Sequence, residues 1–189
     1  MLRSRLACAA FVLAAALGTR LCSATQVEHL DTRAMVQQSS DIVIGTVEGT
    51  RSYWNDRHTK ILTDVTVRVS DRLKGSGGPT VTLTQLGGEL DGFRYQIEGS
   101  PEFQRGQEAL LFLWRDSRGR AQVNGLAQGK FEIRRDRATG ERLVQRALPG
   151  LAARDARTLR LQGAGEAPAR ITLDEMVREI RQVQSEGGR

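Results

Sequence analysis

The side chains that could carry out catalysis are few and scattered along the chain. The two histidines, His29 and His58, lie in different segments without the paired spacing of a metal-binding helix. Asp41, Asp64 and Asp71 could each orient a base beside a serine, but the sequence has no G-x-S-x-G motif to present that serine. The pattern therefore predicts no catalytic residues, no metal site and no cofactor.

Two further patterns that could bind ions or phosphates lack the necessary spacing. The glycine-rich segment 75–78 does not have the G-x-x-x-x-G-K-[ST] spacing, and no predicted helix follows it to receive a phosphate. Asp56, Asp64 and Glu89 are too far apart for a calcium loop, which needs ligands at alternate positions over about 12 residues. We interpret the glycine-rich segment as a turn.

Two aromatic residues are the better candidates for recognition. Tyr53 and Trp54 lie in a polar segment, 48–59, which we predict to be a connection between strands. Amphipathic aromatic side chains at exposed positions often anchor protein interfaces. The alternative is that both side chains close one end of the fold. The sequence leaves both possibilities open, and we predict Tyr53 and Trp54 as binding residues.

An arginine-rich stretch could bind a polyanion. Acidic residues are interleaved with the arginines, however, and only one aromatic residue, Phe131, lies nearby to stack on a base. A solvated hairpin and loop is therefore the favoured interpretation, with nucleic acid or anionic glycan binding less favoured. The arginines are Arg134, Arg135, Arg137, Arg142, Arg146, Arg154, Arg157 and Arg160.

The first 24 residues have the three regions of a secretory signal peptide. Arg3 and Arg5 precede an uncharged apolar run, residues 6–17, which is shorter than the roughly 20 residues of a membrane-spanning helix. Small residues in Cys22-Ser23-Ala24 place the predicted cleavage between Ala24 and Thr25. Lipoprotein cleavage before Cys22 is disfavoured by the bulky Leu21. We expect a secreted or periplasmic protein with no membrane span.

Composition favours one globular domain. The chain has 189 residues, 39% of them hydrophobic and 26% charged, which excludes collagen, coiled coil and wholesale disorder. Removal of the predicted signal peptide leaves 25 basic and 22 acidic residues and takes away both cysteines, Cys8 and Cys22. The mature chain would therefore depend on its hydrophobic core alone.

Most of the chain between residue 40 and about residue 133 is predicted to form β-strands. Alternating apolar residues over 61–69, in particular Ile61, Val65, Val67 and Val69, predict a half-buried strand. The continuous apolar run 109–114 predicts a strand that is covered on both faces. Other predicted strands span 42–47, 81–86, 93–97 and 123–133, the last bent at Gly125 and Gly129.

Helices flank these strands. Residues 26–38 predict a short helix. Residues 146–171 contain prolines and glycines that break every pattern, and we predict a flexible loop there. Thr172 and Glu175 form a capping box for a helix over 172–185. Its apolar stripe is expected to pack on the strands and consists of Leu173, Met176, Val177, Ile180 and Val183.

A short helix, five or more strands and a closing helix predict a mainly β fold, a small OB-like Greek-key barrel over residues 25–145. Several segments between about residues 30 and 133 carry a family resemblance. They are residues 40–47, Thr63 with Val65 and Val67, Leu73-Lys74-Gly75, Gly87-Gly88, Phe103 with Gly106 and residues 108–113, and Gln128-Gly129-Lys130-Phe131. Together they resemble a group of uncharacterised exported bacterial proteins.

The layout is also similar to the OB-fold domain of the tissue inhibitors of metalloproteinases and of netrin modules. In that domain a strand of the type D-v-v-v-x-G-x-V, a Leu-Lys-Gly turn and a G-x-x-y-L-l-F strand recur. The resemblance implies an OB-like fold. Those inhibitors ligate the protease zinc through an amino-terminal cysteine, and the predicted mature chain from Thr25 onward has no cysteine. That mechanism therefore does not transfer.

These observations predict a secreted or periplasmic, non-enzymatic module that binds or inhibits a protein partner. The alternative is an envelope structural protein or accessory subunit that uses its barrel to assemble with a partner. A polyanion-binding protein is the third and least favoured possibility.

Overall fold

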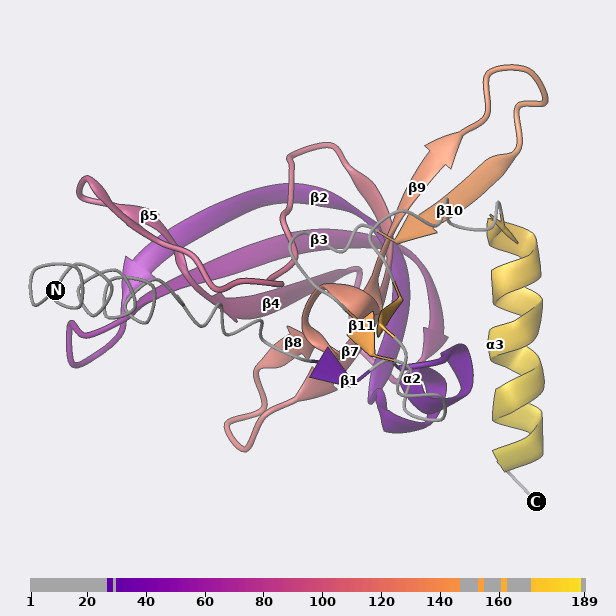
Figure 1. Cartoon of the computed structure of the whole chain (residues 1–189), viewed down its shortest axis with the longest axis horizontal. Coiled ribbons are helices and arrows are strands. Elements are labelled where there is room, and N and C mark those ends of the chain that lie inside the picture. Colours follow the sequence, from indigo (N-terminus) through magenta and orange to yellow (C-terminus); the bar gives the residue numbers. More distant parts are fainter. Residues whose placement is uncertain (1–26, 29, 147–152, 155–160, 163–170, 188–189) are drawn as a thin grey trace, which may run out of the picture.

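A computed structural model describes residues 27–28, 30–146, 153–154, 161–162 and 171–187 (Figure 1). The predicted signal peptide, residues 1–24, lies outside this part of the chain, as does most of the predicted loop 146–171. The fold is mainly β, with a closed five-stranded barrel and two helices. No helix within the described ranges is long and apolar enough to cross a membrane.

The barrel confirms the OB-like fold predicted from the sequence. Its strands are β2 (Asp41–Trp54), β3 (Ile61–Lys74), β4 (Thr80–Leu86), β7 (Glu108–Arg115) and β8 (Ala121–Val123). Around the barrel they follow the order β2-β3-β4-β8-β7 and return to β2. The last strand therefore inserts between the third and the fourth, a Greek-key arrangement, and only the β4–β8 pair is parallel.

The continuous strand predicted over 123–133 is interrupted, because a short 3-10 helix, η1 (Leu126–Gly129), separates β8 from β9 (Lys130–Arg135). The predicted change of direction at Gly125 and Gly129 is present, since these two residues flank and end this helix. Both strands pair with β7, one along each half of it. The remaining strands are β1 (Val27–Glu28), β5 (Gly88–Leu90), β6 (Phe93–Tyr95), β10 (Arg142–Arg146), β11 (Ala153–Arg154), β12 (Leu161–Gln162) and β13 (Ile171–Thr172).

Valine and leucine side chains fill the barrel interior. Along β3, alternate residues are buried from Ile61 to Val67, whereas Val69 is only partly buried at the edge of the cluster. The buried members of the interior cluster are Val43, Val47, Val65, Val67, Val81, Leu83, Ala109, Leu111, Leu113 and Ala121. The predicted period-two strand is thus present.

A second core covers the outer face of the barrel wall. Leu110 and Phe112 of β7 point away from the interior and pack against α2 (Thr32–Gln38) and α3 (Leu173–Gly187). Because Leu111 and Leu113 point inward, β7 is covered on both faces, as predicted. Figure 1 shows α3 standing beside the barrel, on the side away from the β5–β6 hairpin.

The capping box at α3 forms as predicted. The Thr172 backbone N–H donates to Glu175 Oε2 at 2.9 Å, and the Glu175 N–H donates to Thr172 Oγ1 at 3.2 Å. The side chains of Leu173, Met176, Ile180 and Val183 are buried. This helix seals the outer core.

Two further sequence predictions differ from the structure. The helix predicted over 26–38 begins only at Thr32, because Asp31 is the N-cap and its Oδ1 accepts the Ala34 N–H at 2.7 Å. The polar connection predicted over 48–59 is wrong for residues 48–54, which continue β2. This part of β2 has little apolar alternation because it projects beyond the filled barrel, and pairing with β3 keeps it extended.

Candidate binding site at the open barrel end

A register change in β2 creates the inner wall of the site. Pairing of β2 with β3 is irregular between Val47 and Gly49. Beyond this bulge Thr50, Ser52 and Trp54 lie opposite Val65, Thr63 and Ile61, whose side chains point into the barrel. Polar and aromatic side chains therefore continue the inner face where the apolar core ends.

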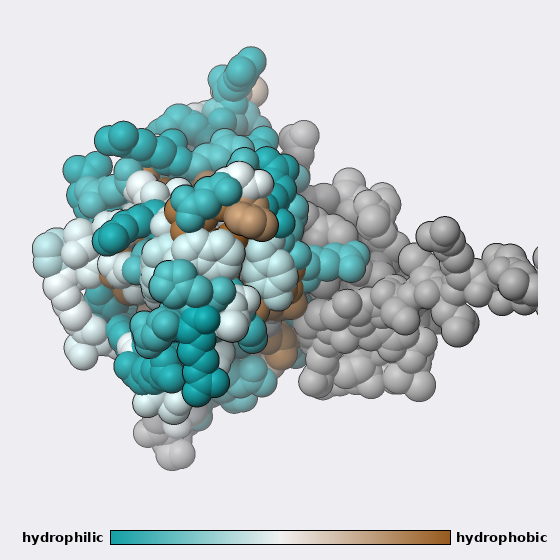
Figure 2. All heavy atoms as spheres, turned by 90° about the vertical axis from the view of Figure 1, so that its left-hand side faces the viewer, coloured by the Kyte–Doolittle hydropathy of each residue, from teal (hydrophilic) through white to brown (hydrophobic). Residues whose placement is uncertain are grey.

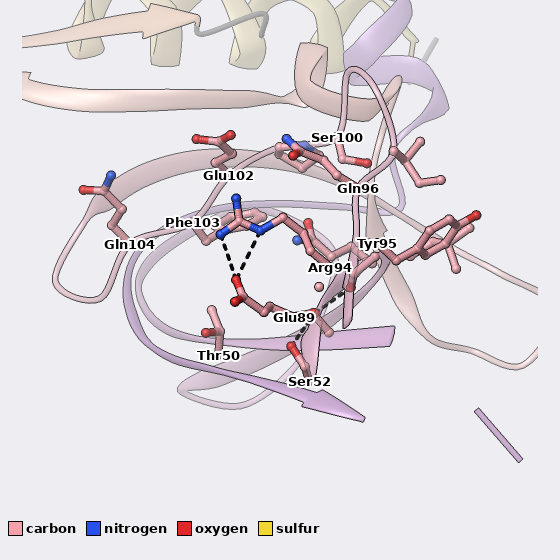
Figure 3. Close-up of a pocket in the computed structure, with 17 residues that line it drawn as sticks. Thr50, Ser52, Glu89, Arg94, Tyr95, Gln96, Ser100, Glu102, Phe103 and Gln104 are labelled. Atoms are coloured by element: carbon pink, nitrogen blue, oxygen red, sulfur yellow. Dashed lines mark hydrogen bonds and ion pairs between the residues drawn. The ribbon is translucent and has the colours of Figure 1, made fainter. Parts of the chain in front are cut away.

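A pocket of about 560 Å³ opens at this end of the barrel (Figure 3). It lies between β2, the β5–β6 hairpin and the segment 96–104. Figure 2, which views the molecule from this side, shows mostly hydrophilic side chains with a small hydrophobic group among them. The pocket itself is lined by polar side chains together with the apolar Leu86, Ile97 and Phe103.

An ion pair stands at the pocket entrance. Arg94 of β6 donates through Nη2 to Glu89 Oε2 of β5 at 2.9 Å, directly across the hairpin. Figure 3 shows the pair between Thr50 and Ser52 on one side and Phe103 on the other. Both side chains are well exposed, so the pair contributes little stability and can exchange partners with a ligand.

Hydroxyl groups form the pocket floor, where two glycines allow close approach. Ser52 Oγ lies 3.0 Å from Thr63 Oγ1, which donates to the Gly87 carbonyl at 2.7 Å. A Cβ on Gly88 would lie 2.3 Å from Thr63 Oγ1, so no larger residue fits there without displacing the floor. The Gly87-Gly88 pair ends β4 as predicted.

A buried lysine fixes the opposite wall. The Lys130 ammonium group donates to the Glu102 carbonyl, lies 4.9 Å above the Phe103 ring and is 3.5 Å from Glu132 Oε1. Burial lowers the pKa of Lys130. Since Glu102 and Phe103 line the pocket, this contact holds one wall in place.

Aromatic side chains gather beside the pocket. The Trp54 ring packs edge-on against Phe93, with centroids 5.9 Å apart, and stacks on His58 at 6.4 Å. Trp54 Nε1 donates to Asp91 Oδ2 at 3.0 Å. Phe93 remains 63% exposed although it is wholly apolar. We call Trp54, Phe93 and Tyr95 the aromatic rim, because Tyr95 lines the adjoining pocket.

The structure separates the two predicted binding residues. Trp54 belongs to the aromatic rim, whereas Tyr53 lies on the outer face of β2 and donates through its hydroxyl to Asp64 Oδ1 at 3.0 Å. The same oxygen accepts from Thr84 Oγ1 at 2.7 Å, and burial raises the pKa of Tyr53. Tyr53 is thus engaged in a cross-strand network away from the pocket.

Sequence reasoning missed the contribution of the β5–β6 hairpin. The alternation at Phe93 and Tyr95 indicated a strand, and a strand is present, but we expected no site there. The useful signal was the short turn Leu90-Asp91-Gly92-Phe93, because an Asp-Gly pair favours a tight hairpin that leaves its neighbours exposed. The hairpin brings Phe93 to Trp54.

The arginine-rich hairpin β9–β10 offers fewer free charges than its sequence suggests. Arg134 lies 2.8 Å from Glu132, and Arg142 lies 3.5 Å from Glu108. Arg146 packs over the Phe131 ring at 4.7 Å, and its burial lowers its pKa to about 10. These contacts agree with the interpretation of a solvated hairpin better than with a polyanion-binding surface.

Among the residues that the structure describes, no three potential metal ligands come together. Comparison with known proteins adds no assignment: neither a protein family nor a curated protein matches this chain.

Proposed function

We propose that the protein is a non-enzymatic module that binds or inhibits a protein partner through the aromatic rim and its adjoining pocket. The observation that carries the proposal is Phe93, which is 63% exposed yet held against Trp54. Burying such a side chain in an interface is worth about 1.5–3 kcal/mol. A rigid exposed aromatic group beside polar residues is typical of a binding hot spot.

The chemistry of the pocket favours binding over catalysis. Among the described residues that line it, none is a histidine or a cysteine. The Ser52 hydroxyl on its floor lies 3.0 Å from the Thr63 hydroxyl, so its hydrogen-bond contact is with another alcohol and not with a histidine base. The exposed Glu89–Arg94 pair suits recognition of polar groups on a partner.

We further propose that the protein acts in the periplasm or outside the cell, where a partner would meet the chain after removal of residues 1–24. This rests on the signal-peptide pattern alone. Protein purified from its native host should begin at Thr25, and amino-terminal sequencing checks this. A chain that retains Met1, or carries a lipid on Cys22, would contradict it.

Site-specific photo-crosslinking tests the binding function. A benzophenone amino acid in place of Phe93 should cross-link one discrete partner from the extracytoplasmic fraction of the native host. The matched control carries the same group in place of Arg137, an exposed residue in the β9–β10 turn. Cross-linking at neither position, or equally at both, would reject the aromatic rim as the recognition surface.

A further inference from the structure

Hydrogen bonds on both sides of β3 establish which backbone groups of β2 point outward. The Asn55 N–H donates to the Lys60 carbonyl at 2.9 Å, toward β3. The Gly87 N–H donates to the Ile61 carbonyl at 2.8 Å, on the far side of β3. Because direction alternates along a strand, Thr50, Ser52 and Trp54 direct their N–H and C=O groups away from β3.

Within the described part of the chain, no strand pairs with that side of β2 over residues 50–54. β7 pairs with β2 only from Asp41 to Thr46. The last contacts along this edge are the Val47 N–H to the Gln107 carbonyl at 2.9 Å and the Gly106 N–H to the Val47 carbonyl at 2.8 Å. Beyond them, residues 50–54 form an open edge about 16 Å long, at ~3.3 Å per residue.

We propose that this open edge accepts an extended peptide segment of the partner as an added β-strand. The inference rests on the proposed binding function and specifies its chemistry. The incoming segment would continue the position that β7 occupies along the first half of β2. Three N–H donors and three carbonyl acceptors, from Thr50, Ser52 and Trp54, would pair with it.

Because side chains alternate along a strand, every second side chain of the bound peptide would point into the pocket, which would therefore select the peptide sequence. Peptide residues opposite Thr50, Ser52 and Trp54 would point to the same face as these side chains, and therefore toward the pocket. Thr50 and Ser52 line that pocket together with the Glu89–Arg94 pair. Polar side chains fit there, because the hydroxyl groups of Thr50 and Ser52 and the exposed Glu89–Arg94 pair can exchange hydrogen bonds with them.

A buried side-chain oxygen of Gln85 also favours a polar peptide side chain in the pocket. Gln85 Oε1 is buried and has no hydrogen-bond partner among the described residues, and Gln85 lines the pocket. A peptide side chain that donates a hydrogen bond, such as an amide or hydroxyl, would supply one. At the outer end of the edge, the residue opposite Trp54 would meet the aromatic rim, which favours an apolar side chain. The expected ligand is a peptide of about five extended residues.

The test uses a phage-displayed library of random 12-residue peptides, selected on the purified full chain. The best enriched peptide is then synthesised with a single backbone N-methyl group at each position in turn. Added-strand binding predicts affinity losses of about tenfold or more at alternate positions and small losses between them. Failure to enrich any peptide, or losses without this alternation, would overturn the proposal.

A proline substitution provides the matching test on the protein. Ser52→Pro removes an N–H that points away from β3, so the β2–β3 ladder stays intact. It should weaken peptide binding at least about tenfold more than Ser52→Ala, which keeps the N–H. Arg137→Pro is the control, because Asp136 begins that turn and proline suits the following position. Equal affinity of Ser52→Pro and Ser52→Ala would reject the added strand.

These outcomes separate the added strand from the binding function itself. Suppose that a partner cross-links through position 93 but binds Ser52→Pro as well as it binds Ser52→Ala. This result would support the proposed binding function and reject the added strand. The N-methyl series is measured on the unmodified protein and keeps the proposal testable if Ser52→Pro does not fold.

Discussion

At the scale of single residues, burial on β3 changes from one position to the next. Val67 is fully buried in the barrel interior, whereas Thr66 faces the opposite side and is half-buried. Val67→Asp should therefore lower the free energy of unfolding by several kcal/mol, and Thr66→Asp by about 1 kcal/mol. Urea unfolding of both variants measures the difference. Equal losses would mean that β3 is covered on both faces at this point.

Protonation of Lys130, which holds one wall of the pocket, makes the stability of the folded protein depend on pH. Burial lowers its pKa in the folded protein below the unfolded value of 10.5, so the unfolded chain binds more protons between the two values. The cost of burying the ammonium group is present at neutral pH and is relieved as pH rises through the folded pKa.

The stability of the wild-type protein relative to Lys130→Met should therefore increase as pH rises from neutral through the lowered folded pKa toward the unfolded value of 10.5. Urea unfolding of both proteins across this range measures the relative free energy, and groups common to both cancel. A constant difference, or one that favours Lys130→Met as pH rises, would contradict a buried and charged Lys130.

At the scale of elements, one motif of the family resemblance has a structural explanation. Asp41 is buried between Arg72 and Arg115, each 3.1 Å from one of its carboxylate oxygens. Lys74 Nζ donates to the Val36 carbonyl at 2.6 Å and so satisfies the end of α2. Gly75 packs directly on Asp41. The Leu-Lys-Gly turn thus joins β3 to the start of β2 and to α2.

Gly75 offers a test of that junction with a matched control. Gly75 has φ of +85°, and an added Cβ would lie 2.6 Å from Asp41 Oδ1. Gly140 has a similar φ of +75° but open space around it. Gly140→Ala should cost about 1 kcal/mol from backbone strain alone, and Gly75→Ala at least about 2 kcal/mol more. Thermal and urea unfolding compare them, and similar losses would show that the contact with Asp41 is unimportant.

The sequence predicted best the elements that bury many apolar residues. β3 and α3 do so at regular spacing and β7 in one continuous run, so the sequence indicated all three. The second half of β2 projects from the barrel and carries no such pattern. The meeting of Trp54 with Phe93 depends on how two hairpins lie against each other, which no local pattern encodes.

At the scale of the whole molecule, the outer core and the proposed recognition surface lie at different ends of the barrel. Helices α2 and α3 cover the outer core around Leu110 and Phe112. The pocket lies beside the β5–β6 hairpin (Figure 3), and this hairpin also carries Phe93 and Tyr95 of the aromatic rim. Substitutions in the rim should therefore change binding with little effect on folding, because neither core contains a rim side chain.

Partner binding by Phe93→Ala, measured together with its melting temperature, tests this separation most directly. The partner is the protein that cross-links through position 93, and Arg137→Ala is the surface control. We expect at least about a tenfold loss of affinity with a melting temperature like that of the wild type, since Phe93 is already 63% exposed. Unchanged affinity, or a melting temperature that falls by many degrees, would show instead that the rim aromatics close the barrel end.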